Sequence, residues 1–140
     1  EEDFYMHYKK ILLKCNNIHW IGFIKVSSEK FNELTSECSY TILPSCSEGV
    51  ATSVATCMRK GLVPIVTDET GIDVDDFGFK ITNLNIENLK KKIRSISKIS
   101  TKELNEKSIR SYLSSFKYTQ SSFSNSFESA MIDLLFLNKS

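Results

Sequence analysis

The residues best suited to chemistry lie between Pro44 and Gly61, where a short polar loop leads into a helix of small residues. Glu48 and Gly49 open that predicted helix, and its first turn carries no bulky side chain. Main-chain amides at a helix start favour anions, and a carboxylate accepts hydrogen bonds from sugar hydroxyls. The segment therefore predicts a site for a ligand that carries both phosphate and hydroxyl groups.

Particular residues of this segment are candidates for contact with that ligand. Gly49 lets the backbone approach a ligand because it has no Cβ. The amides of Val50, Ala51 and Thr52 are expected to face a diphosphate. Ser45 and Ser47, in the same loop, are further substrate-binding candidates.

Two apolar runs flank this segment and are predicted to position it. Tyr40–Leu43 reads as a short strand, and Leu62–Val66 reads as a parallel strand covered on both faces. In an open parallel sheet, ligands bind outside the carboxyl ends of the strands. The loop that starts at Pro44 is therefore expected on the binding edge of the sheet.

The rest of the chain continues this alternation of strands and helices. Its patterns predict two further strands, one over 18–24 and a minimal one over 79–81. They also predict a helix before Asn16, a helix capped by Ser27 or Ser28, helices capped by Asn85 and by Ser100, and a last amphipathic helix with Phe123 and Phe127. We expect one α/β domain over 1–140 with a parallel sheet of about four strands, in which 98–140 forms extra C-terminal helices.

The order Pro44-Ser45, Glu48-Gly49, helix, Gly61-Leu62-Val63-Pro64-Ile65-Val66 resembles the donor-binding segment of GT-B fold glycosyltransferases, in particular retaining family 4. The resemblance covers residues 5–97, and the terminal helices more loosely. It implies a Rossmann-like C-terminal domain. It also implies transfer of a sugar from a nucleotide-diphosphate donor to a hydroxyl acceptor with retention of configuration, in polysaccharide or cell-envelope glycan synthesis.

The resemblance gives several residues roles. Glu48 takes the place of the glutamate that holds donor-sugar hydroxyls, and is the candidate catalytic residue. Gly49, Val50 and Ala51 take the place of the amides that touch sugar and phosphate. Thr56 stands where the family has a second, ribose-binding glutamate. Either the nucleotide is held differently, its affinity is reduced, or the chain is a degenerate homologue.

Other candidates lie outside the motif. The segment that includes Phe23 and Ile24 looks like the one that borders the base pocket in the family. Gly71 matches the glycine that, in the family, commonly follows the strand corresponding to Leu62–Val66, and it is expected to face the donor. For Trp20 and Ile21 we expect core packing.

No metal or separate cofactor is expected. The acidic residues of 67–78 do not have the spacing of an EF-hand loop, and GT-B enzymes, by resemblance, need no protein-held metal. We interpret this segment as a solvated loop. His7 and His19 are isolated in sequence and are expected to be structural.

The chain begins at Glu1 without a methionine, so we expect it to be part of a longer protein. By resemblance, an acceptor-binding N-terminal domain and an arginine and a lysine that contact phosphate would precede it. The isolated chain is then expected to be inactive, with an acceptor glycan or lipid-linked saccharide held by the absent domain. The 18–24 strand is expected to pair with 40–43 or with another chain, which would make a homo-oligomer.

Composition limits the remaining classes. A formal net charge of +1 argues against nucleic-acid binding, and no apolar stretch approaches the ~20 residues that span a bilayer. The four cysteines lack the close spacing of a zinc or redox motif, so free thiols and a cytoplasmic location are expected.

Two other classes stay open. One is a non-catalytic α/β interaction domain, a degenerate glycosyltransferase homologue that uses its aromatic C-terminal helices as the contact surface. The other is a different enzyme on a related fold, such as a sugar-nucleotide epimerase.

Overall fold

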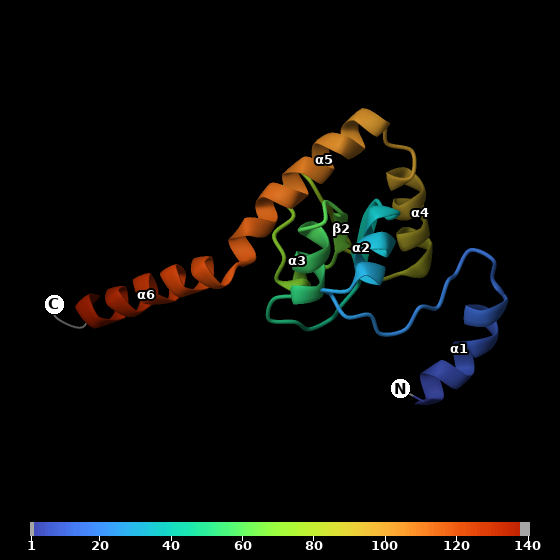
Figure 1. The fold of residues 1–140 in the computed structure, drawn as a ribbon, viewed down its shortest axis with the longest axis horizontal. Helices are drawn as coiled ribbons and strands as arrows, with labels where there is room; N and C mark the ends of the chain where they lie inside the picture. The colour runs from blue at the N-terminus through green and yellow to red at the C-terminus, as the bar shows by residue number, and fades with distance from the viewer. Residues whose placement is uncertain (1, 138–140) are drawn as a thin grey trace. The chain divides into compact units, whose positions relative to one another are not determined.

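The computed structural model describes residues 2–137 (Figure 1). Its contacts divide the chain into two compact units, here called the N-terminal unit (1–32) and the core unit (33–140). The N-terminal unit contains helix α1 (Glu2–Lys14), and helix α2 (Glu29–Ser36) spans the boundary. The Ser28 hydroxyl accepts a hydrogen bond from the Phe31 amide at 3.2 Å, which confirms the predicted cap of α2.

The predicted strand over 18–24 is not formed, and this segment is irregular. The expected pairing with 40–43 is also absent, because in the described chain that strand pairs only with the strand at 63–66. A strand needs a neighbour to satisfy its amides and carbonyls, and residues 2–32 contain no other strand. Trp20 and Ile21 are exposed rather than packed in a core, so that expectation was wrong.

The core unit is built on a parallel sheet of three strands in the order β1-β2-β3. These are β1 (Tyr40–Leu43), β2 (Val63–Val66) and β3 (Phe79–Lys80). Leu43 lies opposite Val66, so β1 and β2 end at the same edge of the sheet. The architecture is α/β with a small parallel sheet flanked by helices, and the described chain has three strands where about four were expected.

Alternating side chains of β2 place a helix on each face of the sheet. Val66 packs into a buried cluster with residues of α3 (Thr52–Met58). Ile65 packs instead against Ile96, at the end of α4 (Ile86–Ile96). Figure 1 shows α3 and α4 on either side of β2. This two-sided cover agrees with the fully buried pattern of β2.

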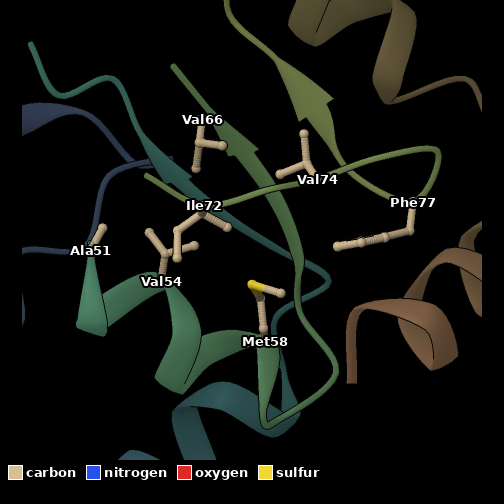
Figure 2. Close-up of a cluster of buried hydrophobic side chains, with 7 residues drawn as sticks. All are labelled: Ala51, Val54, Met58, Val66, Ile72, Val74 and Phe77. Carbon is tan, nitrogen blue, oxygen red and sulfur yellow. The ribbon is translucent and has the colours of Figure 1, made fainter. Parts of the chain in front are cut away.

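The cluster on the α3 face is the larger of the two (Figure 2). Val54 and Met58 project from α3 toward Ile72, and Phe77 closes the cluster from the loop before β3. Met58 is completely buried. This packing fixes α3 against the sheet, and therefore also fixes the position where the polar loop before α3 ends.

Helix α5 (Thr101–Ser114) is tied to the connection between α3 and β2. The hydroxyls of Ser108 and Ser111 donate hydrogen bonds of 2.7 Å to the carbonyls of Gly61 and Leu62, respectively. The short helix η2 (Ser115–Tyr118) and helix α6 (Gln120–Leu137) follow. The predicted caps of α4 and α5 are both formed, because Asn85 and Ser100 accept main-chain hydrogen bonds there.

Apolar faces of the later helices are less buried than their periodicity indicates. In α4, Ile96 is buried, but Ile86 and Ile93 are exposed. In α6, Phe123 and Phe127 are exposed as well. None of the helices in the described part of the chain is long and apolar enough to cross a membrane.

Candidate functional site

The loop between β1 and α3 is attached to the turn that follows β2. The Glu48 amide donates to the Glu69 carbonyl at 3.0 Å, and the Ala51 amide donates to the Thr70 carbonyl at 2.9 Å. The buried hydroxyl of Thr67 donates to the Ser45 carbonyl. Because β1 and β2 end together, these bonds hold the loop on the carboxyl edge of the sheet.

Two glycines meet at the centre of this arrangement. Gly71 ends the short helix η1 (Asp68–Thr70) in the left-handed conformation, with φ of 63°. A Cβ at Gly71 would collide with the carbonyl oxygen of Gly49. A Cβ on Gly49 would instead enter open space. The backbone conformation and the contact with Gly49 therefore require a glycine at position 71, whereas the absence of a side chain at Gly49 leaves room beside Glu48.

The carboxylate of Glu48 lies at the surface of this edge. The Ser45 hydroxyl donates to Glu48 Oε1 at 3.3 Å, and Ser45 Oγ in turn accepts the Ser47 amide at 3.5 Å. A carboxylate has about four acceptor positions, so this contact leaves most of them open. Glu48 is placed where it can accept hydrogen bonds from hydroxyls of a ligand.

The amides at the start of α3 are less available than expected. Ala51 is buried and its amide is used by Thr70, so it does not offer a hydrogen bond to a ligand. Helix α3 has only 7 residues and begins at Thr52. Because the helix is short, its dipole is weak, and the start of α3 alone would bind phosphate only weakly.

Val50, Thr52 and Thr56 line a groove of about 660 Å³. Its other wall is formed by η2 and the first turns of α6. The Thr56 hydroxyl donates to the Thr52 carbonyl at 2.8 Å, so toward a ligand it is free only to accept. This is the position where the resemblance places ribose contact.

The groove also contains two cations, Arg59 and Lys117, that the sequence analysis did not single out. Arg59 lies three residues after Thr56, and helical spacing alone could have suggested it. Lys117 lies far away in sequence, and only the packing of η2 against α3 brings it here.

Two sequence-predicted residues, Phe23 and Ile24, belong to the N-terminal unit. The loop and the groove are built from residues of the core unit. Phe23 is 96% exposed, so it has no packing role. Contact of these two residues with a nucleotide base stays a prediction.

The acidic loop after β2 is engaged by basic side chains. Asp68 pairs with Lys80 at 2.8 Å, and this contact raises the pKa of Lys80. Hydrogen bonding with Asp75 lowers the pKa of Asp73. In residues 2–137 no group of histidine, cysteine or acidic side chains is arranged to hold a metal ion.

Comparison with protein-family models and with curated proteins finds no match for this chain.

Cysteine reactivity gives an independent test of the loop's placement. All four cysteines are free; Cys46 is exposed in the loop, whereas burial raises the pKa of the Cys57 thiol on α3. At pH 8, iodoacetamide is expected to modify Cys46 well before Cys57, because Cys57 is less accessible and has less thiolate. The Cys57 rate should rise as the pH is increased toward its raised pKa.

Peptide mass spectrometry after timed quenching measures both rates. The urea-unfolded chain is the control, in which the two rates should converge. Equal rates in the folded chain would contradict the placement of Cys46 and Cys57.

Proposed function

We propose that this chain is the donor-binding part of a retaining glycosyltransferase of the GT-B type, acting on a nucleotide-diphosphate sugar. Three features support the proposal: a parallel α/β sheet, a polar loop at its carboxyl edge, and a groove beside that loop. The acceptor, a glycan or lipid-linked saccharide, would bind outside this chain.

The observation that carries the proposal is the setting of Glu48. Its carboxylate is exposed at the sheet edge where ligands of parallel α/β proteins bind. The loop that bears it is held by three hydrogen bonds to the neighbouring turn, so the carboxylate is presented from an ordered backbone. Val50, two residues further along the chain, lines the groove, so an ordered and exposed acceptor group at Glu48 suits the recognition of a hydroxylated ligand.

Glu48 would bind and orient the sugar by accepting hydrogen bonds from its hydroxyls. As the sugar leaves the diphosphate, negative charge develops on the phosphate oxygens, and nearby hydrogen-bond donors or cations stabilise it. Retention of configuration and the nature of the acceptor are inferred from the resemblance.

Calorimetric titration of UDP- and GDP-sugars into the chain tests this role. Glu48→Gln keeps the size of the side chain but removes its charge, and a hydrogen bond to a charged group contributes about 1.5–3 kcal/mol. We expect affinity for the preferred nucleotide sugar to fall by about tenfold or more. The matched control is Glu69→Gln, which removes the same charge from the adjacent turn and should leave the affinity unchanged.

Equal affinity of Glu48→Gln and the wild type would remove Glu48 from the site. Absence of binding to either class of nucleotide sugar would favour the alternative, a non-catalytic interaction domain. That alternative is supported by the exposed aromatic residues of α6, among them Phe123 and Phe127.

A further inference from the structure

The groove between α3 and η2 carries positive charge without a carboxylate in its lining. Arg59 and Lys117 are its charged residues, and no aspartate or glutamate of the described chain lines it. Several other lining side chains end in hydroxyls, including those of Thr52, Thr56 and Ser126. Such a lining suits an anion that also accepts and donates hydrogen bonds.

Arg59 is held in place by stacking. Its guanidinium lies 3.6 Å from the centroid of the Phe116 ring and 5.7 Å from that of Tyr112. This cation–π contact restrains the side chain, and a guanidinium can bind phosphate through two parallel hydrogen bonds. Because Phe116 directly precedes Lys117 in η2, the same contact brings Arg59 beside the turn that carries the second cation.

The wall opposite α3 is ordered by its own hydrogen bonds. Ser122 Oγ donates to the Phe116 carbonyl at 3.0 Å, and the Ser122 amide donates to Thr119 Oγ1 at 3.2 Å. These bonds fix the junction of η2 and α6, so Lys117 extends from an ordered turn. The two cations are thus supported by ring stacking on one side and by a hydroxyl network on the other.

We propose that Arg59 and Lys117 bind the diphosphate of the nucleotide sugar in this groove, with the sugar extending toward Glu48. The choice of ligand rests on the proposed function, whereas the cationic groove stands without it. The proposal also accounts for one departure from the expected site, because the Ala51 amide, which was expected to face the diphosphate, is occupied by Thr70. Phosphate binding through side-chain cations does not need that amide.

One carboxylate competes for Lys117. The Lys117 ammonium lies 3.7 Å from Asp75 Oδ2, and both side chains are more than half exposed, so the pair is weak. A diphosphate carries more charge and should displace it. Asp75 has a positive φ of 36°, which asparagine adopts readily, so Asp75→Asn should keep the backbone and tighten ligand binding by about two- to threefold.

The test is titration of UDP, GDP and inorganic pyrophosphate into the 140-residue chain at low and high salt. Arg59→Gln and Lys117→Gln should each weaken binding by about tenfold or more, with a reduced salt dependence. Lys91→Gln on α4, an exposed lysine outside the groove, is the matched control and should bind as the wild type does. Arg59→Lys, which keeps the charge but loses the planar fork, should fall between.

The outcomes separate this inference from the proposed function. Nucleotide-sugar binding that depends on Glu48 but not on Arg59 or Lys117 would overturn the inference and leave the proposed function standing. Binding of diphosphates through the two cations, without any contribution from Glu48 to sugar binding, would overturn the role proposed for Glu48 and leave the cationic groove standing as a diphosphate site. Failure of all three probes to bind at millimolar concentration would overturn the inference. Circular dichroism of each variant establishes that a loss of binding is not a loss of fold.

Discussion

Replacement of Met58 by alanine is expected to lower the free energy of unfolding by about 2–5 kcal/mol. Met58 is completely buried on α3 and packs in the cluster with Val54 and Phe77 (Figure 2). The truncation removes apolar contacts and leaves a cavity between α3 and the sheet. Because native domains are stable by only about 5–15 kcal/mol, the loss should be visible as a lower urea midpoint by circular dichroism.

Met131→Ala is the matched control for this substitution. It deletes the same atoms from α6, where the side chain is 42% exposed. Its effect should stay within about 0.5 kcal/mol. Equal destabilisation by the two variants would contradict the assignment of the larger core cluster to the α3 face of the sheet.

Gly71→Ala is expected to cost about 2–4 kcal/mol of unfolding free energy, from two causes that add. The left-handed conformation of Gly71 penalises any Cβ by about 1–2 kcal/mol. A Cβ there would also collide with the Gly49 carbonyl oxygen, which must displace the loop that carries Glu48. Urea unfolding measures the stability, and the same variant should also lose nucleotide-sugar affinity.

Gly49→Ala separates the effect on stability from the effect on nucleotide-sugar affinity, because a Cβ at Gly49 meets nothing within 4 Å. We expect its stability to match the wild type within about 0.5 kcal/mol. Its nucleotide-sugar affinity should fall, since the added methyl group occupies the space beside Glu48. A Gly71→Ala variant as stable as Gly49→Ala would mean that the loop and the turn do not approach each other.

Local signals in the sequence predicted the central part of the fold well. The apolar run ending at Val66 is a fully buried strand, and Asn85 and Ser100 cap helices as expected. Each of these features depends on neighbouring residues in the sequence. The position of the Glu48 loop at the carboxyl edge follows from the parallel strands on either side of it.

Features that depend on distant partners were predicted less well. The 18–24 segment has strand composition, but a strand also requires a neighbour, and residues 2–32 provide none. Ile86, Ile93 and Ile96 recur at helical spacing in α4, yet Ile96 is buried against the sheet while Ile86 and Ile93 are exposed. Periodicity identifies an apolar face without saying what covers it.

The candidate site shows the same division. Glu48 and Gly49 were singled out from the motif and Gly71 from the resemblance, and the structure brings the loop and the turn that carry them together. Lys117 could not be found in this way, because it reaches the groove only through the packing of η2 against α3.

Amide chemical-shift mapping of the ¹⁵N-labelled chain, titrated with UDP-glucose and GDP-mannose, tests the donor-binding proposal most directly. We expect at least one of them to shift the amides of 45–52 most strongly, together with those of Arg59 and Lys117. The amides of α4 should stay unchanged. Absence of shifts at millimolar ligand, or shifts confined to residues outside the loop and the groove, would contradict the proposal.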